Sequence, residues 1–246
     1  MADLLSSLKG KNIFITGSAR RLGRQLALSI AQIGANVIIH HGHSASEANQ
    51  TLEEVKSYGV EAAALIGDLG DYNQVQSLIS QASLFGPLYA LINNAALFSP
   101  LSFQQTNLTD WQNHLAINLT APFILSQTFA ASLHPGQKGR IVNILDWRAL
   151  RPGADHFPYT ISKAGLAAMT QSLAITLAPA ITVNGLALGA VLPPSDGSTN
   201  AGLLKYVPAA RWASIDEVCQ ALLFLLSGPE YITGEIIHID GGRHLI

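Results

Sequence analysis

Three residues capable of acid–base chemistry lie within the stretch LDWRALRPGADHFPYTISK, residues 145–163. Tyr159 and Lys163 are four residues apart at an expected helix start, so they share one helix face. An ammonium group beside a phenol favours the phenolate, so we expect the pKa of Tyr159 to fall from ~10 towards neutrality, which suits a general acid. Asp146 precedes this pair and supplies a carboxylate. Such pairs also arise by chance, so the surrounding elements must decide the matter.

Short apolar runs alternate with helical patterns along the whole chain. We expect strands at 12–17, 36–41, 62–68, 89–95, 140–145, 181–187 and 235–240, and helices at 20–34, 44–59, 72–82, 107–132, from about 159, and at 215–226. Continuous apolar strands indicate a sheet covered on both faces, and strand–helix alternation is typical of a parallel sheet. The sequence therefore predicts an α/β fold, a single-domain doubly wound (Rossmann-like) parallel sheet over residues 1–246.

Ligands of such sheets bind beyond the carboxyl ends of the strands. The polar residues that stand out fall at those ends: residues 16–23 follow the first strand, Asp68 the third, residues 93–96 the fourth and Asp146 the fifth. This repeated coincidence predicts one site along that edge.

The turn TGSARRLG, residues 16–23, joins the first strand to the first helix. A glycine turn there presents backbone N–H groups and a helix N-terminus to a pyrophosphate. Only Gly17 and Gly23 are present, so the turn is not the G-x-G-x-x-G fingerprint. Arg20 and Arg21 add positive charge where a phosphate would lie, although a solvated basic turn has the same composition.

The second strand ends in VIIHHGHSAS, where NAD-specific folds usually place an acid for the ribose 2′-hydroxyl. This chain offers His41, His43 and Ser44 instead. Since a carboxylate would repel a 2′-phosphate, its absence favours NADP(H). A metal site is disfavoured because no carboxylate or cysteine completes the ligand set.

Two further strand ends carry candidate ligands. Asp68 is a candidate cap of the following helix and also a candidate contact beside an adenine pocket, and one residue can fill both roles. Asn94 and Ala95 allow a cofactor to approach closely, and Phe98 is either core filling or a ring beside the nicotinamide.

Composition excludes several other classes of function. The 246 residues carry a net charge of −2 and no basic block, which argues against nucleic-acid or anionic-membrane partners. The start resembles no secretory signal, no apolar run approaches ~18 residues, and Cys219 is alone, so we expect a cytoplasmic protein without a membrane span. Only 12% of residues are charged, and the helix after Tyr159 is apolar or small nearly all round, which indicates a subunit interface rather than burial within its own domain.

The chain resembles a classical short-chain dehydrogenase/reductase over essentially its full length. The motifs are TGSARRLG, GDL, NNA, Asn118 in AINL, YTISK and VNGLALG. The resemblance implies a nicotinamide cofactor and commonly a homotetramer, with Tyr159 as proton donor, Lys163 on the nicotinamide ribose and Asn118 supporting a proton-relay water. The cofactor contacts it implies are Gly17, Arg20, Arg21, Leu22, Gly23, His41, His43, Ser44, Asp68, Leu69, Asn94, Ala95, Lys163 and Gly189.

Within that family the chain is most similar to the pteridine reductases and the bacterial dihydromonapterin reductases. Arg21 replaces the middle glycine of the turn, HSASEAN resembles their phosphate loop, and Asp146 stands where most members have a serine. The substrate contacts implied are Arg21, Phe98, Asp146 and Tyr159, and residues 190–212 would form a substrate lid. His43 replaces the arginine typical of the phosphate loop, which predicts a weaker NADPH preference at high pH.

The aspartate suits reduction of a ring C=N, because it can feed a proton through Tyr159 to nitrogen. An ionised Asp146 would oppose the alkoxide that forms on a ketone. We therefore expect an NADPH-dependent reductase of a dihydropterin, dihydrofolate or dihydromonapterin. The alternatives are a carbonyl reductase of the same family, a non-catalytic NADP(H)-binding regulator, and an assembly component.

Overall fold

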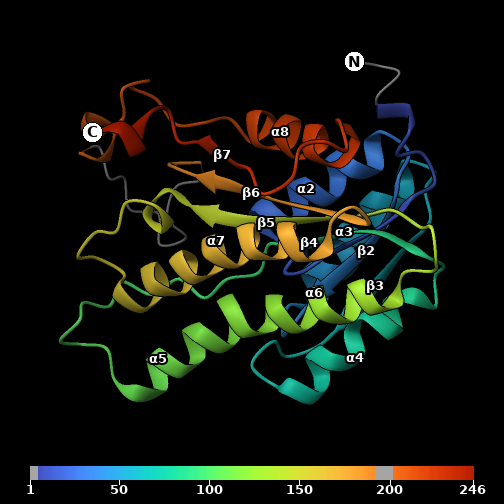
Figure 1. The fold of residues 1–246 in the computed structure, drawn as a ribbon, viewed down its shortest axis with the longest axis horizontal. Helices are drawn as coiled ribbons and strands as arrows, with labels where there is room; N and C mark the ends of the chain where they lie inside the picture. The colour runs from blue at the N-terminus through green and yellow to red at the C-terminus, as the bar shows by residue number, and fades with distance from the viewer. Residues whose placement is uncertain (1–4, 192–201) are drawn as a thin grey trace.

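The computed structural model describes residues 5–191 and 202–246 and contains one seven-stranded sheet in the order β3-β2-β1-β4-β5-β6-β7 (Figure 1). Every pair of neighbouring strands is parallel. The strands are β1 (Asn12–Ile15), β2 (Asn36–His41), β3 (Ala62–Ile66), β4 (Leu88–Asn93), β5 (Gly139–Asp146), β6 (Ile181–Leu188) and β7 (Ile236–Ile239). The predicted doubly wound parallel sheet is confirmed.

Helices cover both faces of the sheet, as Figure 1 shows. On one side α2 (Arg21–Gln32), α3 (Ala45–Ser57) and α8 (Ile215–Ser227) bury apolar residues in one core cluster. On the other side lie α4 (Tyr72–Ser83), α5 (Leu108–Leu115), α6 (Ala121–Ser132) and α7 (Phe157–Leu177). Strands β1, β4, β5 and β6 are buried nearly throughout, which explains their unbroken apolar runs, whereas the edge strands β3 and β7 are mostly half-buried.

Helix starts follow the local chemistry, with one correction to the sequence reading. Asp68 does not cap α4; Asp71 does, accepting hydrogen bonds from the backbone N–H groups of Asn73 and Gln74. Asp68 instead accepts from Gly70 N at 2.8 Å. Helix α7 begins at Phe157, two residues before Tyr159, with proline in its first turn.

The helix expected at 107–132 is present but not uniform. A π-helical turn, η1 (Ala116–Thr120), separates α5 from α6. Such turns are rare and occur frequently at functional sites. Among the described residues, one helical segment, Leu108–Ser132, is by length and composition able to cross a membrane. Core helices pass the same test, and α6 packs Ala121, Ile124 and Phe129 into the core.

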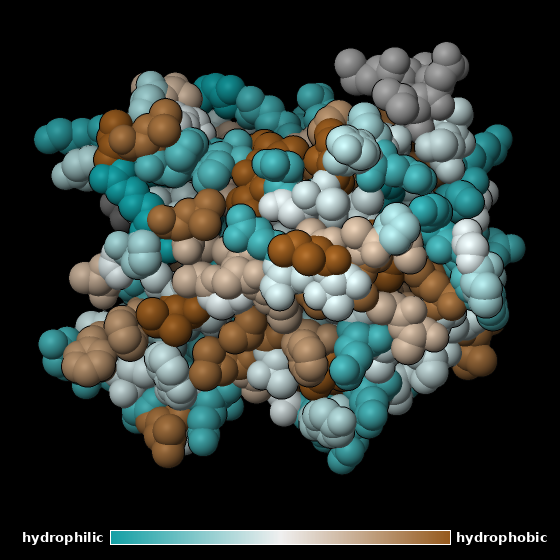
Figure 2. All heavy atoms as spheres, viewed as in Figure 1, coloured by the Kyte–Doolittle hydropathy of each residue, from teal (hydrophilic) through white to brown (hydrophobic). Residues whose placement is uncertain are grey.

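Large apolar side chains also lie exposed on this layer of helices. Leu108, Phe123, Ile161 and Ile175 are between 37% and 83% exposed. Figure 2 shows brown and pale residues, apolar or weakly polar, gathered over α6 and α7 in the middle of this face. A patch of this kind is typical of a surface that meets another protein.

The sheet topology places one crevice for ligands. The chain leaves β1 towards β2 and β3 on one side, and returns to β4 on the other. Ligands of open α/β sheets bind at such switch points, beyond the carboxyl ends of the strands. The turn after β1, with Gly17, and the end of β4, with Asn94, therefore flank the expected crevice.

Candidate functional site

Asp146 and Tyr159 meet beyond the carboxyl end of β5. Asp146 is the last residue of β5, and Tyr159 lies in the first turn of α7. The tyrosine hydroxyl donates a hydrogen bond to Asp146 Oδ2 at 3.2 Å. The tyrosine is 7% exposed, so the pair lies largely out of solvent.

The expected fall in the Tyr159 pKa is wrong for this arrangement. Burial and the neighbouring Asp146 carboxylate both raise that pKa well above its ordinary value, because each disfavours a second negative charge. The Lys163 ammonium lies 5.8 Å from the tyrosine ring centroid, farther than the carboxylate is from the phenol oxygen. Tyr159 is therefore a phenol at neutral pH, a state in which it holds a proton to give.

Lys163 is fully buried beneath Tyr159. Its Nζ donates to the carbonyl oxygen of Ile144 at 2.6 Å, which ties the side chain to the end of β5. Burial lowers its pKa to about 8. The ammonium form still prevails at pH 7, and the group loses its charge in the mildly alkaline range.

Asn118 lies within the π-helical turn and is fully buried. Its Oδ1 accepts from Leu97 N at 2.7 Å, and its Nδ2 donates to Leu97 O at 3.0 Å and to Ser162 Oγ at 2.9 Å. Asn118 thus joins the loop after β4 to α7. The proton-relay role implied by the family stays a prediction.

Phe98 approaches the same place from the loop after β4. Its ring packs edge-on against Tyr159 with centroids 4.7 Å apart. It also stacks on His156, with centroids 4.1 Å apart and planes 14° from parallel. Phe98 is 54% exposed, so the core-filling alternative is wrong and its ring borders the candidate site.

The sequence reading missed the residues that hold Asp146. The Arg148 backbone N–H donates to Asp146 Oδ1 at 2.9 Å, and its guanidinium Nη1 lies 3.4 Å from the same oxygen. Arg148 also donates to Asp155 from Nη2, at 2.6 Å, and from Nε. Charges two and nine residues after Asp146 were the available signal.

The turn after β1 is braced tightly. Gly17 has a φ of +62°, and a Cβ at this position would lie 2.9 Å from the Cα and Cβ atoms of Ala95. Asn94 Nδ2 donates to the carbonyl oxygens of Thr16, at 2.8 Å, and Gly17, at 3.1 Å. Gly23 is buried, and a Cβ there would clash with the Gly17 carbonyl oxygen. The glycines therefore fix a compact turn.

Helix α2 opens directly from that turn. Arg20 is its N-cap and makes no side-chain capping hydrogen bond, and no acid lies in its first turn. Arg21 has a φ of +53°, which is uncommon for a non-glycine residue, and is exposed, as Arg20 is. Partly buried Leu22 packs against the core. Backbone N–H groups at such a helix start can receive an anion.

His40, which was not among the predicted site residues, is hydrogen-bonded to the backbone of this turn. Its Nδ1 accepts from Gly17 N at 3.1 Å, and its Nε2 donates to Gly67 O at 2.9 Å. Burial lowers its pKa to about 4, so the ring is neutral. His41 is also buried, and its Nδ1 has no hydrogen-bond partner among the described residues. His43 is exposed and Ser44 begins α3.

Two further residues implied by the family lie along the same edge. Leu69 is buried beside exposed Asp68. Gly189 follows β6, and a Cβ there would lie 2.6 Å from Asp240 Cα, so no larger residue fits without movement. Among the described residues, no group of three His, Cys, Asp or Glu side chains could hold a metal ion.

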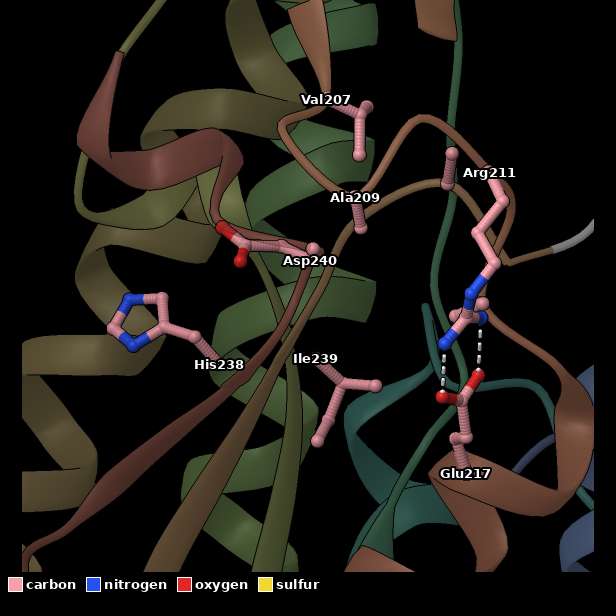
Figure 3. Close-up of a pocket in the computed structure, with 10 residues that line it drawn as sticks. Val207, Ala209, Arg211, Glu217, His238, Ile239 and Asp240 are labelled. Carbon is pink, nitrogen blue, oxygen red and sulfur yellow. Dashed lines mark hydrogen bonds and ion pairs between the residues drawn. The ribbon is translucent and has the colours of Figure 1, made fainter.

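A separate hollow of about 220 Å³ lies at the end of β7 (Figure 3). It is bordered by Ala190, Val207 and Ala209 of the expected lid segment, and by His238 and Asp240. Figure 3 shows Arg211 and Glu217 forming a paired ion bridge on one side of it. Neither Tyr159 nor Asp146 lines this hollow, so the hollow is separate from the candidate catalytic site. The expected lid residues 192–201 lie outside the described residues.

Comparisons with known proteins identify the family. Residues 11–203 match the model of the family described as short chain dehydrogenase. A 3-oxoacyl-[acyl-carrier-protein] reductase of Aquifex aeolicus is 34% identical, over 96% of this chain and 98% of its own. The 5-keto-D-gluconate 5-reductase of Escherichia coli is 30% identical, over 98% of each chain.

Among solved structures, the FolM alternative dihydrofolate reductase 1 of Brucella canis, complexed with NADP, superposes with a TM-score of 0.90. It is 32% identical and the match covers 97% of this chain and 96% of that one. The family match spans most of the chain. The chain belongs to the short-chain dehydrogenase/reductase family and is an oxidoreductase.

Proposed function

We propose that this chain is an NADPH-dependent reductase of a pteridine, with a dihydropterin, dihydrofolate or dihydromonapterin as substrate. The observation that carries the proposal is the hydrogen bond from Tyr159 to Asp146, 3.2 Å long, with the Phe98 ring packed edge-on against the same tyrosine. An acid and a flat aromatic surface thus adjoin one buried phenol. A flat nitrogen heterocycle matches both, since its N–H groups can donate to a carboxylate and its ring can stack.

Features of the turn after β1 support the cofactor. Gly17 packs closely against Ala95, which keeps the turn compact, and the start of α2 offers backbone N–H groups to the phosphates of a dinucleotide. Buried His41 Nδ1 has no partner among the described residues, and no acid lies between the end of β2 and Ser44. These features fit a cofactor with a 2′-phosphate, as in the Brucella canis structure with NADP.

A nicotinamide held at this site would supply the hydride for a ring carbon of the substrate. Tyr159, protonated at neutral pH, would give its phenolic proton to the ring nitrogen. Asp146 orients that hydroxyl and accepts from a substrate N–H group. Lys163, tied to Ile144 O, would hold the ribose, and Phe98 would carry the substrate ring.

A carbonyl reductase is the second candidate, because sequence relatives at 28–34% identity are named as 3-oxoacyl-[acyl-carrier-protein] reductases. The two candidates differ in what they require at position 146. Ketone reduction places negative charge on oxygen, which an ionised carboxylate opposes and a serine hydroxyl stabilises.

The test is NADPH consumption with dihydrobiopterin, dihydrofolate and dihydromonapterin against a set of ketones, in wild type and Asp146→Ser. We expect wild type to turn over a dihydropterin best, and the variant to lose at least about tenfold in that rate while gaining on ketones. A variant that improves ketone turnover and keeps the full dihydropterin rate contradicts the proposal. Absence of NADPH oxidation with every substrate would favour a regulator.

The assembly we propose is a homotetramer. The exposed apolar side chains over α5, α6 and α7 support a subunit contact on that face. Light scattering of the full chain gives the mass, and a monomer at micromolar concentration would contradict this part.

A further inference from the structure

We propose that Arg148 is a positioning residue, which holds Asp146 Oδ1 so that Oδ2 alone faces the Tyr159 hydroxyl. The inference rests on the proposed role of the Tyr159–Asp146 pair and concerns what keeps that pair aligned.

Two donors from one residue meet the same carboxylate oxygen. The Arg148 backbone N–H lies 2.9 Å from Asp146 Oδ1, and its Nη1 lies 3.4 Å from it. The other oxygen, Oδ2, receives the Tyr159 hydroxyl. Rotation about the carboxylate torsion of an aspartate is soft, so an unclamped carboxylate would sample several angles. The clamp on Oδ1 therefore sets the direction in which Oδ2 points.

Arg148 is itself fixed from the opposite side. Asp155 takes two of its donors, Nη2 at 2.6 Å and Nε at 3.3 Å, and the guanidinium carbon lies 4.9 Å from the Trp147 ring centroid. Arg148 is only 9% exposed, so its charge must be paired. Asp155 provides that pairing in bidentate form. The additional contact with Asp146 is thus not needed to neutralise the arginine, which argues for a task at the reacting pair.

The hydrogen bonds also give Asp146 and Tyr159 different roles. Every hydrogen bond recorded at the Asp146 carboxylate is one that it accepts, from Arg148 on Oδ1 and from Tyr159 on Oδ2. The proton that can move towards substrate is then the one on Tyr159. Asp146 acts as an oriented acceptor, and Arg148 determines its orientation.

Removing the guanidinium changes both the angle and the field at Asp146. The charged and titratable groups around this carboxylate are Arg148, Tyr159 and Lys163, with Arg243 at longer range. Arg148 is the cation in contact with Asp146 Oδ1, so its loss leaves that oxygen with the backbone N–H alone and frees the carboxylate to turn. We expect kcat to fall by up to ~100-fold while the Kd for NADPH and the KM for the dihydropterin stay near their wild-type values.

The experiment compares Arg148→Gln, the double variant Arg148→Gln/Asp155→Asn, and the control Arg151→Gln. The glutamine keeps the backbone N–H on Oδ1 and removes only the guanidinium. The double variant also removes the acid that Arg148→Gln leaves unpaired, so it stays informative if the single variant folds poorly. Arg151 is an exposed arginine three residues along the same loop. The readouts are kcat and KM for the dihydropterin, the Kd for NADPH and the melting temperature.

The inference predicts that the double variant melts near wild type, yet keeps the low kcat with a near-wild-type KM, while Arg151→Gln behaves as wild type. A double variant with wild-type kcat would overturn it, because Arg148 would then serve only to neutralise Asp155. Failure of the pteridine proposal looks different, since wild type would then reduce no dihydropterin. The Arg148 comparison could still be run on whichever ketone is reduced.

Discussion

The carboxyl end of β5 and the carboxyl ends of β1 and β2 lie along the same edge of the sheet but are built differently. After β5, Asp146, Arg148, Asp155 and Tyr159 all have partners among one another's side chains. After β1 and β2, helix α2 begins without a side-chain cap, and buried His41 Nδ1 has no partner among the described residues. After β5, hydrogen bonds between side chains fix the geometry of the site. After β1 and β2, hydrogen-bond donors are left that an anionic ligand can accept from.

This contrast has a kinetic consequence. Changes to Asp146, Arg148 or Tyr159 should alter the chemical step and leave NADPH binding intact. Changes in the turn after β1 should alter cofactor affinity first. Variants that mix the two effects would blur the distinction.

The largest effect is expected from Tyr159→Phe. The substitution removes the phenolic proton but keeps the ring that packs against Phe98. Since a positioned acid contributes roughly 100- to 10,000-fold, kcat should fall within that range. Initial rates of NADPH oxidation measure it, and fluorescence titration should give a Kd for NADPH within about twofold of wild type. A variant that retained more than a tenth of wild-type kcat would remove Tyr159 from the chemistry.

A smaller effect, on binding, is expected from Gly17→Ala. Residue 17 has a φ of +62°, and a Cβ there would lie 2.9 Å from Ala95, so the turn must open. A left-handed conformation alone costs about 1–2 kcal/mol for a non-glycine residue. We expect the Kd for NADPH to rise at least about tenfold, with little change in kcat at saturating cofactor.

The matched control is Gly59→Ala. Gly59 has a similar φ of +78°, but a Cβ there meets nothing within 4 Å. It should lose stability through backbone strain while binding NADPH as wild type does. If both glycine variants weakened NADPH binding equally, general destabilisation rather than the shape of the turn would be the cause.

Sequence periodicity sufficed for the sheet, the helices and the set of strand ends that carry the site. Strands and helices of the doubly wound fold follow apolar patterns that are local, so α7 and β5 could be located within a few residues. The π-turn around Asn118 could not be foreseen, because it leaves the helical periodicity of residues 108–132 almost unchanged. The direction of the Tyr159 pKa shift was also beyond reach, since it depends on how deeply the phenol is buried and on the contact between its oxygen and Asp146.

The two supporting residues that sequence reasoning missed had weak signals. Arg148 lies two residues from Asp146, but the role of that spacing depends on the turn between them. His40 lies within VIIHH, where alternation along a strand places neighbouring side chains on opposite faces. The alternation therefore predicts that the side chains of His40 and His41 point to opposite faces of the sheet. The structure was needed to show that His40 accepts from Gly17 N beneath the cofactor turn.

The smallest effect is expected from His40→Phe, which tests the hydrogen bond between His40 and the turn after β1. The phenylalanine leaves Gly17 N and Gly67 O without the ring as partner, which should lower the free energy of unfolding at pH 7 by about 1–3 kcal/mol. In wild type the folded-state pKa of His40 is about 4, below its ordinary value of 6.5, so the unfolded chain binds more protons between these values. Wild type therefore loses stability as pH falls from ~6.5 towards 4, and the variant lacks this contribution.

The difference in unfolding free energy between wild type and His40→Phe should accordingly narrow from pH 7 to pH 4.5. Urea unfolding at both values measures it, with exposed His43→Phe as the control that shows no such difference at pH 7. A difference that stayed constant with pH would mean that His40 contributes packing alone. Asn94 and the glycines would then be what fixes the turn after β1, with no contribution from a titratable group. The difference from the network of charged side chains after β5 would then be larger.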